Sequence, residues 1–223
     1  MHRSSFKAVI SDFDGTLADS YQAITASVNH VRALHQLPPL PEPEVRKHVG
    51  RGPGHLLAYT VPGGEAEKDL AAYKAHHPSV LRSGTRLFPG VADTVKALHQ
   101  AGLRLAVCSN KLRPFTLELL DYFGLGTLFE VVIGPEDAPR PKPAPDMLLA
   151  ALSRLGVAKQ DTLYVGDMTV DIATARAAGV TVWVVPTGSD DVIDLRAAHP
   201  DHVLESFRDL AGLLLDTSLS SVD

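Results

Sequence analysis

The sequence is poor in cysteine, because Cys108 is the only one among its 223 residues. An intramolecular disulfide bond is therefore impossible, and such sparing use of thiols is typical of proteins from a reducing compartment. Residues 1–6 are polar and lack the apolar stretch of a secretory signal peptide. We therefore expect a cytoplasmic protein, in which Cys108 is a buried structural thiol.

Long apolar runs and basic clusters are also absent from the sequence. No stretch approaches the roughly 20 apolar residues that a membrane-spanning helix requires. Lys and Arg number 21 against 26 Asp and Glu, which gives a formal net charge of −5, and they form no basic run. A nucleic-acid-binding surface is usually marked by such a run. We expect neither a membrane nor a nucleic acid as a partner.

What is present is the composition of an ordinary globular protein, with 45% hydrophobic and 21% charged residues. A chain of 223 residues is long for one minimal domain and short for two full domains. One α/β domain that carries a smaller insert fits this length. The ten histidines are scattered, and neighbours such as His76 and His77 point apart on a helix, so we expect them on the surface.

Short apolar runs alternate with segments of helical periodicity over most of the sequence. Strands that alternate with helices of about ten residues predict βαβ crossovers and a parallel sheet. The expected strands are residues 7–11, 103–108, 130–133, 162–165, 180–185 and 202–204, and the expected helices are residues 91–100, 117–123, 144–155, 169–178 and 207–215.

The segment after the first strand has a different character. It contains the four prolines of "LPPLPEPE" and the glycines of "GRGPG", and its expected helices cover residues 20–37, 44–49, 55–59 and 65–77. We therefore predict a core of residues 1–18 and 87–223 around a helical insert of residues 19–86. The insert follows the carboxyl end of a parallel strand, where ligands bind in open α/β sheets, so it is well placed to act as a lid.

Polar side chains follow four of the expected strands or open the next helix. Because the carboxyl ends of parallel strands meet at one edge of a sheet, we expect these side chains to converge on one cleft. They are Asp12 and Asp14, Ser109 and Asn110, Lys142, and Asp167 and Asp171.

Such a cluster of carboxylates requires a compensating cation. Carboxylates packed together repel one another, and a hard divalent ion with oxygen ligands offsets that repulsion. Mg²⁺ suits a site that also holds substrate phosphate. An Asp beside the ion can attack phosphorus, while Ser109, Asn110 and Lys142 have the donors needed to hold phosphoryl oxygens. Gly15 lets the backbone turn sharply after the strand.

The motifs "DFDGT", "SN", the lysine of "KP" and "GD…D", in this order, resemble the four motifs of the haloacid dehalogenase (HAD)-like hydrolase superfamily. The position of the insert resembles the subclass with a helical cap, and "HVGRGPGHLL" resembles the cap loop of phosphoglycolate phosphatase-like enzymes. The resemblance implies an α/β fold, a Rossmann-like parallel sheet with an inserted α-helical cap domain.

The resemblance also implies roles for the first motif and for the metal site. Asp12 would be the nucleophile, and Asp14 the acid and base. Mg²⁺ would be bound by the carboxylates of Asp12 and Asp167 and by the backbone carbonyl of Asp14. Asp171 would lie beside the metal site, close to Lys142.

The resemblance implies that other residues bind the substrate. Ser109, Asn110 and Lys142 would bind the phosphate. Thr16 would belong to the same phosphate-binding group and would also help to position Asp14. Arg51 of the cap loop could reach a substrate carboxylate with both arms of its guanidinium. A structural alternative for Ser109 and Asn110 is the N-cap of a helix, and for Arg51 a solvated loop position.

The implied activity is Mg²⁺-dependent hydrolysis of a small phosphate monoester, such as phosphoglycolate, through an aspartyl-phosphate. The partner would be a small phosphorylated metabolite, and the protein a monomer or homodimer. The presence of Asp14 favours phosphate transfer over dehalogenation, and Thr16 favours a phosphatase over a mutase. A phosphomutase like β-phosphoglucomutase, a pyrophosphatase or phosphonatase, and a binding module without catalysis remain as alternatives.

Overall fold

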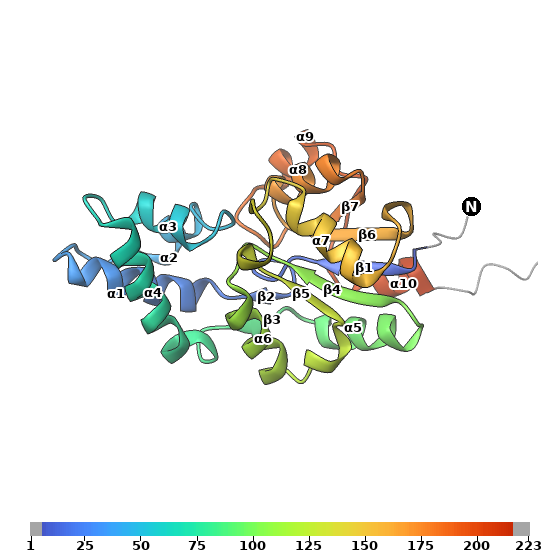
Figure 1. Cartoon of the computed structure of the whole chain (residues 1–223), viewed down its shortest axis with the longest axis horizontal. Helices are drawn as coiled ribbons and strands as arrows, with labels where there is room; N and C mark the ends of the chain where they lie inside the picture. Colours follow the sequence, from blue (N-terminus) through green and yellow to red (C-terminus); the bar gives the residue numbers. More distant parts are fainter. Residues whose placement is uncertain (1–5, 216–223) are drawn as a thin grey trace, which may run out of the picture.

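The computed structural model describes residues 6–215, which form an α/β core with a group of helices at one end (Figure 1). The core holds a six-stranded parallel sheet in the order β5-β4-β1-β6-β7-β8. This arrangement confirms the Rossmann-like fold expected from the sequence. The strands are β1 (Ala8–Ser11), β4 (Arg104–Cys108), β5 (Val131–Ile133), β6 (Thr162–Gly166), β7 (Thr181–Val184) and β8 (His202–Val203).

Helices cover both faces of the sheet, which explains why its strands are continuous apolar runs. In β1, Val9 packs on one face and Ala8 and Ile10 on the other, because successive side chains of a strand point to opposite sides. The face of Val9 is covered by α5 (Val91–Gln100), α6 (Arg113–Tyr122) and α10 (Asp209–Leu215). The opposite face is covered by α7 (Asp146–Leu155), α8 (Thr169–Ala178) and α9 (Val192–Ala197).

The register of the central strand places the motif loops side by side. Ser11, the last residue of β1, lies opposite Val107 of β4 on one side and Val165 of β6 on the other. The residues that follow these three strands therefore leave the sheet at the same edge. This is the edge that faces the separate group of helices (Figure 1).

The helices between β1 and α5 form the cap. They are α1 (Tyr21–Leu34), α2 (Glu42–Arg46), α3 (Pro53–Thr60) and α4 (Ala66–Leu81). They enclose an apolar cluster of their own, in which Val28 and Val31 of α1 are fully buried. No helix within residues 6–215 is long and apolar enough to cross a membrane.

A short ribbon joins the cap to the core. The strands β2 (Ala18–Asp19) and β3 (Arg86–Leu87) pair antiparallel where the chain leaves the core and returns to it. Two-residue strands are too short to produce a periodic pattern, so the sequence did not predict them. The proposed division between residues 1–18 with 87–223 and residues 19–86 passes through this ribbon.

Helices α4 and α9 depart from the sequence prediction for identifiable reasons. Helix α4 continues through Pro78 to Leu81, although a proline usually ends a helix because it removes a backbone donor. Leu81 is fully buried in the core cluster, and this packing outweighs the local cost of the proline. Helix α9 was not predicted, because Leu195 is its only buried residue and one apolar position gives no periodicity.

His77 contradicts the expectation that the histidines lie on the surface, since it is only 1% exposed. Its ring stacks on Tyr73 and packs against Phe115 of the core, with centroid distances of 4.9 Å in both cases. Burial, together with the charge of Lys111, lowers the pKa of His77 to about 3. Phe115, which packs on the ring of His77, comes from α6 and is distant in the sequence. A local sequence pattern could therefore not reveal the burial of His77.

Cys108 is fully buried at the end of β4, as predicted. Burial raises the pKa of its thiol to about 12. The thiol is therefore protonated at neutral pH, and it packs as a small apolar side chain.

The neutral state of His77 predicts a pH dependence of stability. The pKa of His77 is lowered in the folded protein, whereas an unfolded histidine titrates near pH 6.5, so its stabilising contribution is present above pH 6.5 and is lost as the pH falls towards 3. Between pH 7.5 and pH 5, we expect the free energy of unfolding of the wild type to fall by about 2 kcal/mol more than that of His77→Gln. Denaturant titrations at the two pH values measure this difference.

His99→Gln is the matched control, because His99 is exposed on α5. Its free energy of unfolding should change with pH as that of the wild type does. Equal pH dependence for His77→Gln and the wild type would contradict the assignment of a buried neutral imidazole.

Candidate active site

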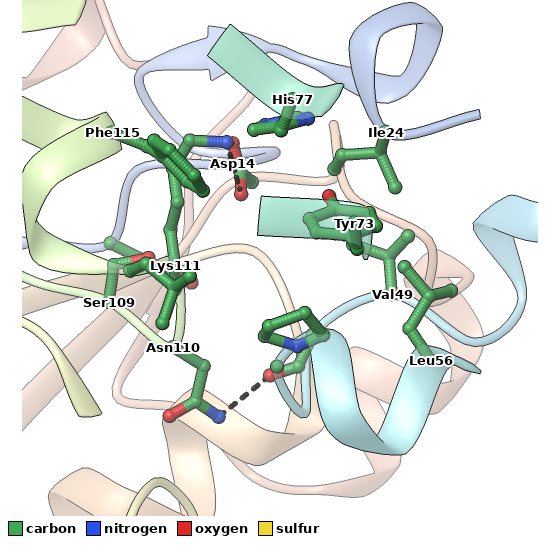
Figure 2. Close-up of a pocket in the computed structure, with 15 residues that line it drawn as sticks. Asp14, Ile24, Val49, Leu56, Tyr73, His77, Ser109, Asn110, Lys111 and Phe115 are labelled. Atoms are coloured by element: carbon green, nitrogen blue, oxygen red, sulfur yellow. Dashed lines mark hydrogen bonds and ion pairs between the residues drawn. The ribbon is translucent and has the colours of Figure 1, made fainter. Parts of the chain in front are cut away.

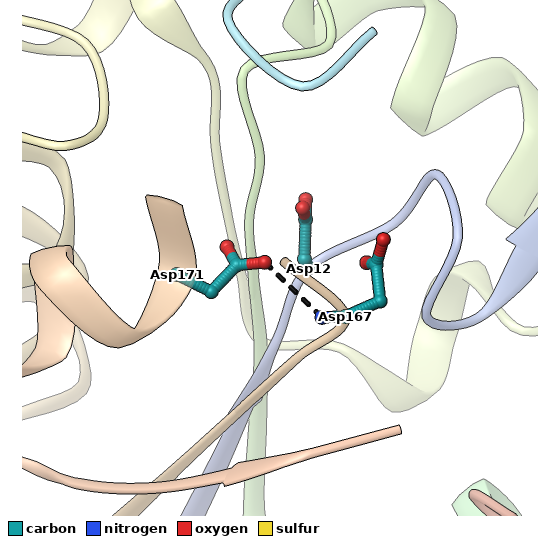
Figure 3. A group of neighbouring side chains, drawn as sticks. All are labelled: Asp12, Asp167 and Asp171. Atoms are coloured by element: carbon teal, nitrogen blue, oxygen red, sulfur yellow. Dashed lines mark hydrogen bonds between the residues drawn. The ribbon is translucent and has the colours of Figure 1, made fainter. Parts of the chain in front are cut away.

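Three carboxylates meet at the edge of the sheet where the motif loops emerge. Asp12 follows β1, Asp167 follows β6 and Asp171 lies in the first turn of α8. One oxygen of each lies within 4.8 Å of the others, and all three residues are buried. Figure 3 shows Asp12 between the other two, with the carboxylates of Asp12 and Asp167 directed to the same side. The convergence expected from the strand ends is therefore present in the fold.

A buried lysine balances part of this negative charge. The Nζ atom of Lys142 lies 2.8 Å from Asp12 Oδ2 and 2.6 Å from Asp171 Oδ1, and it donates a hydrogen bond to the Tyr164 hydroxyl. Burial by itself lowers the pKa of Lys142, but the charges of Asp12 and Asp171 outweigh that effect and raise it well above its usual value. Lys142 is therefore a permanent cation beneath the carboxylates.

Both oxygens of Asp171 are used within the protein. Oδ1 accepts hydrogen bonds from Lys142 and from the hydroxyl of Tyr164, and Oδ2 accepts from the backbone N–H groups of Asp167 and Met168. Four donors leave this carboxylate little capacity for a metal ion. The geometry suits a residue that orients Lys142 and the loop of Asp167.

Asp167, unlike Asp171, has one carboxylate oxygen that no donor of the described residues satisfies. Its Oδ1 accepts a 2.5 Å hydrogen bond from the Thr16 hydroxyl, whereas its Oδ2 is buried without a partner among residues 6–215. Burial, followed by the charges of Asp171 and Asp12, raises the pKa of Asp167 well above its usual value. A buried carboxylate oxygen without a partner is costly unless a cation neutralises it.

Asp12 experiences a similar environment. Burial raises the pKa of Asp12 to about 6, although Lys142 opposes the shift. Its Oδ1 accepts a hydrogen bond from the Phe13 N–H, 2.7 Å away. The side chains of Asp12 and Asp167 are thus oxygen donors of the kind that a hard divalent cation requires, and the unpaired Oδ2 of Asp167 marks where charge is missing. The residues present fit a divalent cation.

Thr16 is tied to the loop after β6. Its hydroxyl donates to Asp167, and within residues 6–215 no hydrogen bond joins that hydroxyl to Asp14. The turn before it depends on Gly15, whose φ of +87° favours glycine. A Cβ added to Gly15 would collide with the Asp167 carboxylate. A Cβ added to Gly188, which follows β7, would collide with the same carboxylate.

A cavity of about 50 Å³ opens beside the carboxylates, between the core and the cap. The core contributes Asp12, Asp14, Ser109 and Asn110, as the sequence predicts. The cap contributes a mostly apolar wall, and Figure 2 shows these side chains facing Asp14 across the cavity. The residues of the cap wall are Ile24, Val49, Gly50, Gly52, Pro53, Leu56, Tyr73 and His77.

Lys111 is a site residue that the sequence analysis missed. Its Nζ lies 3.1 Å and 3.2 Å from the two carboxylate oxygens of Asp14, and its side chain is 4% exposed. It directly follows Ser109 and Asn110 on the loop after β4. Lys111 also follows the carboxyl end of β4, so the sheet topology places it at this edge together with Ser109 and Asn110. The motif "SN" does not include it.

Asn110 connects three segments around the cavity. Its side-chain amide donates to the carbonyls of Lys142 and of Gly50 in the cap, and its Oδ1 accepts from the N–H of Lys142 (Figure 2 shows the bond to Gly50). The helix-cap alternative for Ser109 and Asn110 is wrong, because α6 begins at Arg113 after an N-cap at Leu112.

Arg51 is not brought to the cavity. The residue is exposed, although its neighbours Gly50 and Gly52 both line the cavity wall. Within the described part of the chain, Lys111 supplies the only Lys or Arg side chain of that wall. The positively charged side chain at this wall therefore comes from the core and not from the cap loop.

Comparison with known proteins agrees with this geometry. A family model described as haloacid dehalogenase-like hydrolase matches residues 9–185. The phosphoglycolate phosphatase of Salmonella paratyphi A is 32% identical over 230 aligned residues, which cover 92% of this chain and 91% of that protein. The phosphoglycolate phosphatase of Escherichia coli K12 is 33% identical and is covered to 90% of its length, with 92% of this chain aligned.

Solved structures show the same fold. A predicted phosphoglycolate phosphatase from Haemophilus somnus 129pt superposes with a TM-score of 0.88 at 27% identity, covering 94% of this chain and 98% of that one. A haloacid dehalogenase-like hydrolase from Bacteroides fragilis gives a TM-score of 0.86 at 28% identity, with coverages of 92% and 99%. The chain belongs to the haloacid dehalogenase-like hydrolase family.

Proposed function

We propose that the protein is a phosphatase that hydrolyses a small phosphate monoester of the phosphoglycolate class, with Mg²⁺ as its cofactor. The observation that carries the proposal is the pairing of Asp12 with Asp167, whose buried Oδ2 has no partner among the described residues. The cavity beside this pair is small and holds Asp14 at its wall. The similarity to phosphoglycolate phosphatases supports the substrate class.

The first half of the reaction transfers the phosphoryl group to Asp12. A carboxylate oxygen of Asp12 attacks phosphorus, and the bond between phosphorus and the ester oxygen breaks. That oxygen takes its proton from Asp14, which lines the same cavity, and leaves as the alcohol. Lys142 stays protonated beneath Asp12 and holds the attacking carboxylate in place, since its Nζ lies 2.8 Å from Asp12 Oδ2.

The second half releases phosphate. A water molecule attacks phosphorus of the aspartyl-phosphate and gives a proton to Asp14, and the bond from phosphorus to Asp12 breaks. Inorganic phosphate leaves, and both aspartates return to their starting state. Lys111 contacts both oxygens of Asp14 and so orients the carboxylate that handles the proton.

Asp12, Asp167 and the backbone carbonyl of Asp14 are the proposed ligands of Mg²⁺. When bound, the ion supplies positive charge that offsets the two carboxylates and the phosphoryl oxygens. Ser109 lines the cavity beside Asp12, and we propose that its hydroxyl binds a phosphoryl oxygen. The side chain of Asn110 is bonded to backbone groups, and we propose that it shapes the phosphate site through those bonds.

The remaining proposals concern partners and location. We propose a small phosphorylated metabolite as the partner, with no nucleic acid and no membrane involved. The supporting features are the small cavity and the formal net charge of −5, with no run of basic residues in the sequence. Cytoplasmic location and a monomeric or homodimeric state complete the proposal.

The nucleophile is tested by Asp12→Asn. We expect this variant to lose at least about 10³-fold in kcat for a generic aryl phosphate with Mg²⁺ present, because the amide cannot form the covalent intermediate. Steady-state assays measure the loss, and circular dichroism checks the fold. Asp93→Asn on the exposed side of α5 is the control and should retain wild-type turnover. Appreciable turnover by Asp12→Asn would exclude an aspartyl-phosphate at this residue.

The metal site is tested by thermal unfolding without any substrate. Because Mg²⁺ binds the folded protein, saturating Mg²⁺ should raise Tm by several degrees relative to EDTA. Asp167→Asn should abolish this shift. It should also raise the Tm of the metal-free protein at neutral pH, because it removes a buried unpaired charge.

The metal effect should depend on pH in a defined direction. The pKa of Asp12 is raised to about 6, so in metal-free protein its stabilising contribution is present below pH 3.8 and is lost as the pH rises through 6. Mg²⁺ binds the deprotonated form, so the Tm gain should grow between pH 4 and pH 7. A Tm gain that is constant over this range would contradict the assignment of Asp12 as a ligand.

A further inference from the structure

The cap wall of the cavity contains a buried polar atom that the proposed reaction does not use. Nε2 of His77 is buried, and among residues 6–215 it has no hydrogen-bond partner. His77 lines the cavity together with Tyr73 and Phe115, and Figure 2 shows its ring above Asp14. Buried polar atoms of native proteins are nearly always paired, so this atom points to a partner that arrives with the ligand.

The other nitrogen of the ring fixes its orientation. Nδ1 of His77 lies 2.8 Å from the Ser27 hydroxyl, which also lies 3.2 Å from Nδ1 of His76. A hydroxyl has one proton, so Ser27 donates to one histidine and accepts from the other. We assign the donated proton to the shorter contact, which leaves Nε2 of His77 protonated and therefore a donor towards the cavity.

His77 is an uncharged donor, and the charge beside it belongs to Lys111. The ammonium of Lys111 is close enough to help lower the pKa of His77, and its Nζ contacts Asp14 on the same side of the cavity. An ammonium has three donors, so Lys111 can contact Asp14 and a further anion together. The opposite wall, formed by Ile24, Val49 and Leu56, is apolar and offers no competing partner.

We propose that His77 and Lys111 together form a subsite for a carboxylate of the substrate, in which His77 is the specificity-determining residue. Nε2 of His77 donates to one carboxylate oxygen, and Lys111 supplies the charge. The inference rests on the proposed phosphatase function. The small cavity requires that the carboxylate be only a short distance from the phosphoester, because both must fit between Asp12 and α4.

The subsite should discriminate between esters that differ only in this group. An ester without an oxygen at this position leaves both the buried imidazole donor and the ammonium unpaired, whereas a carboxylate satisfies them. A site built around such donors commonly rejects the deficient analogue by large factors. Phosphoglycolate, hydroxyethyl phosphate and ethyl phosphate form a suitable series, because they share the same phosphoester and nearly the same size.

The experiment measures kcat/KM for the three esters with Mg²⁺, in the wild type, His77→Phe, His77→Gln and His99→Phe. The wild type should prefer phosphoglycolate over ethyl phosphate by at least about 10-fold. His77→Phe should lower this ratio by about 10-fold or more, and His77→Gln, whose amide can donate, should retain part of it. His99→Phe is the control and should leave the ratio within about twofold, because His99 is exposed on α5 and does not line the cavity.

The outcomes separate the two proposals. Equal kcat/KM of the wild type for the three esters, or an unchanged ratio in His77→Phe, would overturn the carboxylate subsite while the phosphatase stands. Failure of the wild type to hydrolyse any of the esters would overturn the proposed function itself. Each ratio is taken within one preparation, so partial unfolding cancels. If His77→Phe does not fold, Ser27→Ala takes its place, because loss of the Ser27 hydroxyl removes the contact that leaves the proton of His77 on Nε2. A lower ratio in Ser27→Ala supports the donor role, and an unchanged ratio would overturn it.

Discussion

The ion pairs of the buried Lys142 with Asp12 and Asp171 are the interaction on which the site depends. Three carboxylates lie within 4.8 Å of one another, and their mutual repulsion would open the loops without an opposite charge. Lys142 supplies one charge permanently, at 2.8 Å and 2.6 Å from two of them. Lys142 contacts Asp12 and Asp171 but leaves Oδ2 of Asp167 without a partner among the described residues. One lysine for three carboxylates therefore holds the loops together and still leaves a carboxylate oxygen that fits a cation.

Much of the core followed from the sequence, because its signals are local and repeated. Helices α5 and α8 have the predicted limits, and the strands of the sheet lie within a residue or two of their expected positions. The convergence of Asp12, Ser109, Lys142 and Asp167 followed from a topological rule, namely that parallel strands share one carboxyl edge. That rule needs no knowledge of side-chain contacts.

The details that escaped prediction depend on partners far apart in the chain. Thr16 bonds Asp167 because the turn after β1 meets the end of β6. His77 is buried because α4 of the cap packs against α6. Arg51 was given a role on its chemistry alone, whereas in the structure it is exposed and does not line the cavity, and Lys111 does. Residue type and spacing identify the edge where chemistry occurs, but not which side chains reach it.

The central position of β1 has a consequence for the way in which the chain folds. β1 is the first strand to be synthesised, yet its neighbours β4 and β6 end at Cys108 and Gly166, after the whole cap. The edge of β1 that pairs with β6 stays open until Gly166 of the 223 residues has emerged, and pairings of such long range are slow to form. Asp12, the proposed nucleophile, follows this strand directly, so the edge that carries the candidate site is completed only when the sheet closes. During synthesis, the helices of the cap can collapse on their own apolar cluster first, and the active edge is among the last features to form.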